Sequence, residues 1–107
     1  MVRTILVIGA GKSTSYLLDY ILKKSDEENL HLIIGDLQPE HIPEKFSSHP
    51  NCSVVQLDIF NDEDRKKAID SASIVISMLP ARLHIKIAED CIHFKKNLVT
   101  ASYVSQE

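Results

Sequence analysis

The sequence is poor in the residues that define several classes of small protein. It holds only three glycines and two cysteines among its 107 residues. Together with a hydrophobic share of 44%, this composition argues against a disordered or low-complexity chain and allows a packed core. Cys52 and Cys91 lie far apart and lack the spacing of a zinc site or a redox dithiol. We therefore expect two buried, reduced thiols.

The chain also lacks clustered basic residues and long apolar runs. Its net charge is −3 and its lysines and arginines are scattered, whereas a nucleic-acid-binding surface needs them clustered against phosphates. The apolar run 5–10 is too short for a signal peptide, and no run approaches the length of a membrane span. We therefore expect a cytoplasmic protein with neither a nucleic-acid nor a membrane partner. No metal site is expected either, because the spacing typical of ligands is missing from His31, His41, His49 and His93.

What the sequence does contain is a regular alternation of short apolar runs and longer amphipathic runs. The predicted strands are residues 4–8, 30–34, 53–57, 73–79 and 98–101, and the predicted helices are residues 12–24, 39–47, 61–69 and 82–96. Because the strands are apolar at consecutive positions, helices should cover both faces of the sheet. Right-handed helical crossovers then predict an α/β fold with a doubly wound parallel sheet of the Rossmann type. We expect the strand order 3-2-1-4-5 and a single layer of helices on each face.

The apolar positions of the first and last predicted helices indicate which faces pack on the sheet. In the first helix they are Tyr16, Leu17, Tyr20 and Ile21, and Leu22 could join them. In the last helix they are Leu83, Ile87, Cys91, Ile92 and Phe94. The polar segment 25–29 is expected to be a turn.

A glycine-rich turn follows the first predicted strand and opens the first predicted helix. Its residues are Gly9, Ala10, Gly11, Lys12, Ser13 and Thr14. Gly9 permits a tight turn, and Gly11 lets the backbone approach a pyrophosphate, which the N–H groups of the next three residues would bind. Thr14 replaces the third glycine of the dinucleotide fingerprint, so a simple turn is the alternative. A Walker-type phosphate loop is excluded, because its first glycine would fall at Leu6.

Asp36 follows the second predicted strand and is the candidate for binding the cofactor's ribose. A carboxylate at this place accepts hydrogen bonds from the adenosine ribose hydroxyls and would repel the 2′-phosphate of NADP. No arginine follows at Leu37 or Gln38 to receive that phosphate. The sequence therefore predicts NAD rather than NADP as the cofactor, and an exposed turn aspartate is the alternative.

Two further segments are candidates for the rest of the cofactor. Asp58 and Ile59 follow the third predicted strand, where adenine would lie, although Asp58 could equally cap the next turn. Leu79 and Pro80 end the fourth predicted strand and would run beside the nicotinamide, although a proline that stops a strand is a sufficient explanation.

Four polar residues lie near the carboxyl ends of the last two predicted strands: Arg82, His84, Ser102 and Tyr103. His84 could carry a proton and Arg82 could anchor a carboxylate, and exposed side chains without a role are the alternative. No catalytic residue is assigned among them.

Several of these segments resemble the saccharopine dehydrogenase family. Residues 75–84 (VISMLPARLH) resemble the family's VIS segment, in which two hydrophobic residues, a proline and then a histidine follow. Residues 95–105 (KKNLVTASYVS) look like its fifth strand and the turn after it, and residues 5–11 are similar to its first strand and glycine turn. Ala81 and Gln106 depart from the tyrosine and proline of several relatives, so the substrate is not carried over.

The resemblance implies an oxidoreductase of lysine and related amino-acid metabolism. Such enzymes form or cleave a secondary amine between an amino acid and its partner, with hydride exchange at a nicotinamide cofactor. Residues 1–107 would be the NAD-binding domain of a longer enzyme, possessing a separate domain for the small-molecule substrate and forming a homodimer. In this hypothesis Gly9, Gly11 and Ser13 contact the pyrophosphate, while Leu79, Pro80 and Ser102 bound the nicotinamide.

The alternative hypothesis is a stand-alone nucleotide-sensing regulatory domain, like those that gate potassium transport. Its glycine turn and its size would be the same. Because such a domain needs no substrate edge, the segments 80–84 and 102–105 favour the enzyme.

Overall fold

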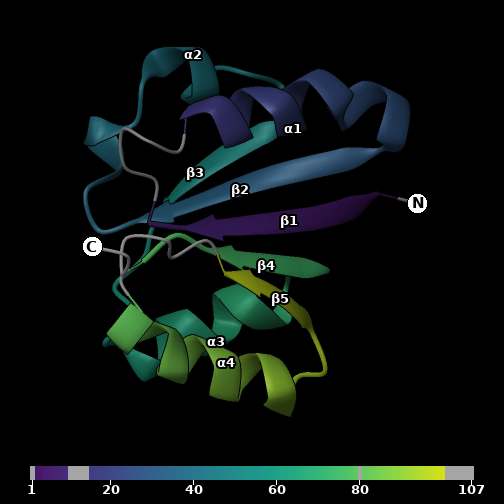
Figure 1. Ribbon diagram of the computed structural model, residues 1–107. Helices are drawn as coiled ribbons and strands as arrows, with labels where there is room; N and C mark the ends of the chain where they lie inside the picture. Colours follow the sequence, from purple (N-terminus) through teal and green to yellow (C-terminus); the bar gives the residue numbers. More distant parts are fainter. Residues whose placement is uncertain (1, 10–14, 80, 101–107) are drawn as a thin grey trace.

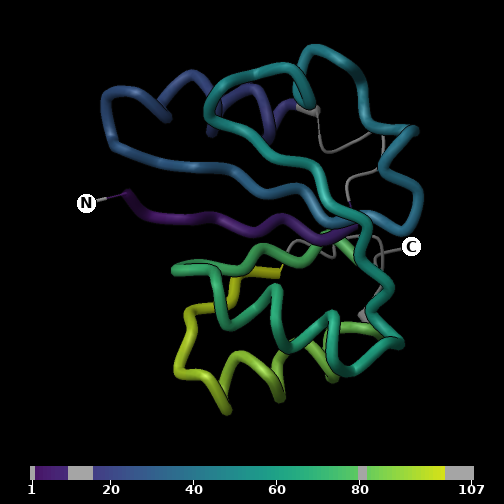
Figure 2. Tube along the Cα trace, turned by 180° about the vertical axis from the view of Figure 1, so that it is seen from behind, coloured from purple at the N-terminus to yellow at the C-terminus, as the bar shows by residue number. Residues whose placement is uncertain are grey.

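The computed structural model describes residues 2–9, 15–79 and 81–100, which form one parallel sheet between two layers of helices, seen from opposite sides in Figures 1 and 2. The strands are β1 (Arg3–Ile8), β2 (Leu30–Asp36), β3 (Cys52–Gln56), β4 (Ile74–Ser77) and β5 (Asn97–Thr100). Each pairs in parallel with its neighbours in the order β3-β2-β1-β4-β5. The predicted doubly wound sheet and its strand order are confirmed.

The helices lie in one layer on each face of the sheet, as predicted. Helices α1 (Ser15–Glu28) and α2 (Glu44–Ser47) cover one face, and α3 (Asp62–Asp70) and α4 (His84–His93) cover the other (Figure 1). Two short 3-10 turns, η2 (Pro39–His41) and η3 (Ala81–Leu83), precede α2 and α4.

Strand β1 supplies both halves of the core. Its alternate side chains point to opposite faces, so Ile5 and Val7 pack with α1 and α2, whereas Leu6 and Ile8 pack with α3 and α4. All four side chains are buried. A central strand covered on both faces needs apolar residues at consecutive positions, which is the pattern from which the parallel sheet was predicted.

Helix α1 differs from its prediction in length and in its buried face. The predicted turn at 25–29 is wrong, because the helix continues to Glu28 and ends at Asn29, whose φ is 55°. The buried stripe is Leu18, Ile21, Leu22 and Ser25, whereas Tyr16 and Tyr20 are 89% and 61% exposed. Of the predicted apolar positions, Ile21 and Leu22 are buried and Leu17 packs partly buried against the same core, so the prediction is wrong for the two tyrosines.

Ser25 is the residue that makes the extra helical turn compatible with burial. Its hydroxyl donates to the Leu22 carbonyl at 2.7 Å and accepts from Asn51 Nδ2 at 2.9 Å. A buried hydroxyl with both roles filled does not destabilise the helix. The polar residues 25–29 predict a turn because nothing near them in the sequence indicates that Asn51 will satisfy the Ser25 hydroxyl.

The predicted helix 61–69 is confirmed as α3, with Asn61 as its cap, whereas the other two predicted helices are shorter or divided. The predicted helix 39–47 is split into η2 and α2, because Pro43 forces Ile42 into an extended conformation (φ −77°, ψ 128°). The predicted helix 82–96 consists of η3 and α4, and ends before Lys95, whose φ is 59°. Ile92, expected on the packed face, is 78% exposed. The predicted strand 73–79 is reduced to β4.

Candidate functional site

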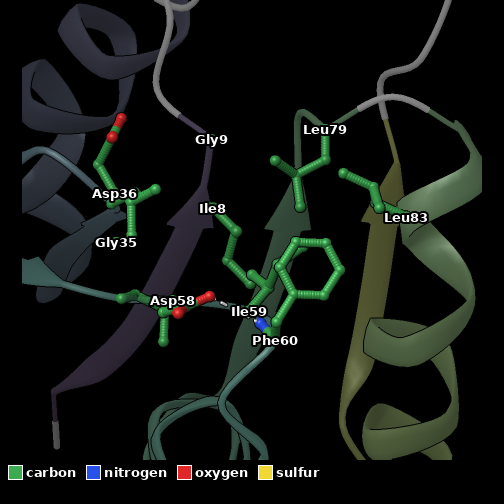
Figure 3. A pocket seen from close by; sticks show the side chains of 11 residues that line it. Ile8, Gly9, Gly35, Asp36, Asp58, Ile59, Phe60, Leu79 and Leu83 are labelled. Carbon is green, nitrogen blue, oxygen red and sulfur yellow. Dashed lines mark hydrogen bonds between the residues drawn. The ribbon is translucent and has the colours of Figure 1, made fainter.

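A cavity of about 220 Å³ opens at the carboxyl ends of β1, β2, β3 and β4 (Figure 3). Its lining residues are Ile8, Gly9, Gly35, Asp36, Leu37, Leu57, Asp58, Ile59, Phe60, Leu79 and Leu83. Strand β1 lies between β2 and β4, so the chain turns to opposite sides of β1 at this edge. Open parallel sheets bind their ligands in the crevice at such a switch point.

Gly9 directly follows β1 and lines the cavity, in a place that only glycine fits without strain. Its φ is +84°, and a Cβ added there would lie 2.7 Å from Leu79 Cδ2. Its N–H donates to the Gly35 carbonyl at 3.2 Å, which ties the start of the glycine turn to β2. The positive φ of Gly9 is a conformation that the predicted tight turn would use. Beyond it, the predicted site residues Gly11, Lys12, Ser13 and Thr14 lie outside the described residues.

Gly35 is a lining residue that the sequence reasoning treated only as the end of a strand. A Cβ added at Gly35 would lie 2.8 Å from Leu57 Cδ2. The absence of a side chain therefore lets the chain leaving β3 pack closely on β2 at the cavity wall. The signal in the sequence was a glycine directly before the candidate ribose ligand, Asp36.

Asp36, the last residue of β2, lines the cavity as predicted. Its Oδ1 accepts a hydrogen bond from the backbone N–H of Gln38 at 2.9 Å. The carbonyl of Asp36 also accepts from the Leu57 N–H at 2.9 Å. Figure 3 shows Asp36 beside Gly35, with Leu79 on the other side of β1. The carboxylate is thus held in place through one oxygen, and Oδ2 is the oxygen suited to receive a ligand hydroxyl.

Asp58 both lines the cavity and stabilises the turn that follows β3. Its Oδ1 accepts from the Phe60 N–H at 2.9 Å, and its carbonyl accepts from the Asn61 N–H at 2.9 Å. The two interpretations that the sequence left open, a cofactor contact and a turn cap, are therefore compatible. Ile59 is buried and lines the same wall.

Phe60 is a functional candidate that the sequence reasoning missed. Its side chain is 66% exposed and lines the cavity (Figure 3). An exposed aromatic ring at the rim of a ligand cavity offers a flat apolar surface for a planar ligand. Its only signal in the sequence was its place two residues after Asp58.

The predicted nicotinamide side is described in part. Leu79 and Leu83 line the cavity, whereas Arg82 and His84 do not. His84 Nε2 and the hydroxyl of Ser77, at the end of β4, are buried and find no hydrogen-bond partner among the residues that the structure describes. Pro80, Ser102 and Tyr103 lie outside the described residues.

The described residues show neither metal nor membrane chemistry. Within the ranges 2–9, 15–79 and 81–100, no group of three or more His, Cys, Asp or Glu side chains could hold a metal ion. Over the same part of the chain, no helix is both long enough and apolar enough to cross a membrane. The cavity instead combines an apolar wall with two carboxylates, which suits an uncharged heterocycle and its sugar.

Comparison with known proteins agrees with this geometry. A family model described as "Saccharopine dehydrogenase NADP binding domain" matches residues 5–107. The alpha-aminoadipic semialdehyde synthase of Arabidopsis thaliana is 30% identical over 120 residues, which cover 96% of this chain and 11% of that protein. The saccharopine dehydrogenase [NADP(+), L-glutamate-forming] of Saccharomyces cerevisiae is 26% identical over 105 residues, which cover 98% of this chain and 23% of that protein. The chain thus spans a minor part of the length of these relatives.

Solved structures support the fold. Apo saccharopine dehydrogenase (L-Glu forming) from Saccharomyces cerevisiae superposes with a TM-score of 0.81 at 20% identity, over 97% of this chain and 22% of that chain. A short-chain dehydrogenase/reductase from Veillonella parvula in complex with NADP gives a TM-score of 0.77 at 18% identity, over 100% of this chain and 51% of that chain. The sheet order, the cavity at its switch point and the family match lead to one conclusion: the chain belongs to the saccharopine dehydrogenase NADP-binding domain family of oxidoreductases, which binds a nicotinamide dinucleotide.

Proposed function

We propose that this chain is the cofactor domain of a saccharopine-dehydrogenase-like oxidoreductase and that it prefers NAD(H) to NADP(H). The observation that carries the proposal is Asp36, whose carboxylate lies at the cavity wall with one oxygen held by Gln38. Its second oxygen would accept hydrogen bonds from the adenosine ribose hydroxyls. The bound nicotinamide would supply hydride exchange with a secondary-amine amino-acid substrate.

The charge of the cavity supports the preference for NAD(H). Its described lining residues include the carboxylates of Asp36 and Asp58 and no lysine or arginine. A 2′-phosphate placed at this wall would face negative charge without a basic side chain to receive it. The family description names NADP, so the preference is argued from this chain's own residues.

The shape of the cavity supports an orientation for the cofactor. Adenine would lie against Ile59 and the ring of Phe60, and the ribose would lie at Asp36. The pyrophosphate would lie at the glycine turn that begins at Gly9, and the nicotinamide would extend past Leu79. In this proposal the substrate is bound by a further domain of a longer, homodimeric enzyme.

The test compares the affinities of the chain for NADH and NADPH by isothermal titration calorimetry. We expect NADH to bind at least about tenfold more tightly, which corresponds to one unfavourable charge pair near a protein surface. Asp36→Asn keeps an oxygen for Gln38 but replaces Oδ2 by an uncharged NH2 group, so it should narrow the ratio of the two affinities both by weakening NADH binding and by removing the charge that disfavours NADPH.

The matched control is Glu40→Gln, which removes the same unit of charge from an exposed side chain in η2, outside the cavity. It should leave the ratio unchanged, because solvent and salt screen an exposed charge. Equal affinities of the wild-type chain for NADH and NADPH would contradict the role of Asp36.

A further inference from the structure

Arg65, on α3, is a buried cation that the cofactor proposal does not use. Its side chain is 5% exposed. Its Nη1 donates to the Ile59 carbonyl at 2.8 Å and to Asp62 Oδ1 at 2.8 Å. Its Nε donates to Asp90 Oδ2 on α4, whose side chain is 7% exposed, at 2.5 Å. One guanidinium therefore joins α3, α4 and the connection that carries the cavity residues 58–60.

Apart from the bonds of Arg65, the connection between β3 and α3 is held by the bond from the Leu57 N–H to β2, by the apolar packing of Ile59 in the core that also contains Ile87 of α4, and by hydrogen bonds near the turn itself. Asp58 Oδ1 accepts from the Phe60 N–H, and Asn61 Oδ1 accepts from the Asp64 N–H at 3.1 Å. These bonds set the shape of the turn, but they do not set its position relative to α4. Arg65 supplies that link through hydrogen bonds, because the same side chain bonds Ile59 and Asp90.

Stability alone is a weak reason for a buried ion pair at this place. Taking both charges out of water offsets most of their attraction, so apolar side chains of similar volume often serve a helix contact equally well. An apolar side chain could not donate to the Ile59 carbonyl. The bond to Asp90 raises the pKa of Arg65 further above its ordinary value, and a guanidinium is charged in proteins in any case. The group is thus suited to hold one carbonyl in a fixed position.

We propose that Arg65 is a positioning residue for the adenosine half of the cofactor: by holding the Ile59 carbonyl against α4 through Asp90, it keeps the wall formed by residues 58–60 in the binding conformation. This inference rests on the proposed function. Without the bond, the wall would have to be ordered when the cofactor binds, and that ordering would lower the affinity. The loss should be confined to the adenosine half, since Leu79, on the nicotinamide side, follows β4.

The test uses the double variant Arg65→Met/Asp90→Leu of the full chain. It replaces the ion pair by apolar side chains of similar volume, so packing between α3 and α4 is kept while the donor to Ile59 is lost. The matched control is Asp62→Asn, which weakens the exposed partner of Arg65 and retains its bonds to Ile59 and Asp90. Thermal unfolding and the affinities for NADH, AMP and nicotinamide mononucleotide are measured for all three proteins.

We expect the double variant to melt within a few degrees of the wild type and to bind NADH and AMP about tenfold more weakly, with unchanged affinity for nicotinamide mononucleotide. The control should match the wild type in every measurement. Should the double variant fail to fold, Asp90→Asn, which keeps the shape of the side chain and removes its charge, should show the same selective loss to a smaller extent.

Two results would overturn the inference. In the first, the variant binds AMP as tightly as the wild type does. In the second, AMP and nicotinamide mononucleotide lose affinity equally while the melting temperature falls, which shows a structural role only. A wild-type chain that binds neither NADH nor AMP would instead overturn the proposed function, so the two failures are distinguishable.

Discussion

Replacing Gly9 with alanine tests the start of the proposed phosphate turn. Gly9 has a φ of +84°, a conformation that disfavours any residue with a Cβ. The added methyl group would also lie 2.7 Å from Leu79 Cδ2. Both effects act at the cavity wall, so Gly9→Ala should weaken NADH binding as well as destabilise the fold.

The expected magnitude is the sum of a backbone term and a contact term. A left-handed backbone disfavours an L-residue by roughly 1–2 kcal/mol. The overlap is with the far end of a flexible leucine, and moving Leu79 off its rotamer costs about 0.5–1.5 kcal/mol. The free energy of unfolding should therefore fall by about 1.5–3.5 kcal/mol, and the backbone term is the larger of the two.

Urea unfolding followed by circular dichroism measures this loss. With a denaturant dependence of about 1.5 kcal/mol/M, the midpoint should fall by about 1–2 M. The matched control is Gly35→Ala, whose Cβ would meet Leu57 Cδ2 at a similar 2.8 Å but whose φ is not positive. Gly35→Ala should lower the free energy of unfolding only by the contact term, about 1 kcal/mol. Equal midpoint shifts for the two variants would refute the reasoning, because the backbone term would then be absent.

Two further predictions concern the helix start after the cavity and the buried thiols. Asn61→Ala should lower the free energy of unfolding by about 1 kcal/mol in the same urea assay, because the Asn61 side chain caps α3 through the Asp64 N–H, and Asn61→Asp should restore it. Burial raises the pKa of Cys52 from 9.0 to about 11 and, with a contribution from Asp90, raises that of Cys91, so both thiols should react slowly with a disulfide reagent at pH 8 until urea unfolds the chain. The buried neutral thiols stabilise the fold below pH 9, and this contribution should be lost as the pH rises from 9 toward 11. Rapid labelling of the thiols in the native chain at pH 8 would contradict the expected slow reaction.

The strands could be located from the sequence because a strand in the middle of a covered sheet needs consecutive apolar residues. Residues 5–8, directly before Gly9, are consecutive apolar residues, and all four side chains are buried in β1. The candidate ribose ligand Asp36 was also predictable, because the ends of parallel strands gather at one edge whatever the details of packing. The wall residues Asp58 and Ile59 were found by the same reasoning.

The faces of the helices were not predictable in the same way. Tyr16 and Tyr20 are apolar enough to suggest a core position, yet both are exposed, and Leu18 is buried beside the predicted Ile21. Ser25 is polar and buried, because Asn51, far away in the sequence, satisfies its hydroxyl. Hydrophobic spacing alone does not carry this information, since the buried face depends on which partner the helix meets.

By itself, the sequence determined the alternation of strands and helices, the order of the sheet and the edge at which a dinucleotide would bind. Local chemistry suffices for these features, because apolar runs, glycines and strand-end carboxylates act through their own backbone and their near neighbours. Only the tertiary structure decided that Gly35 approaches Leu57, that Phe60 lines the cavity, and that Arg65 joins Ile59 to Asp90. Each of these contacts depends on the relative position of two elements once the chain has folded, and no pattern within either element encodes that position.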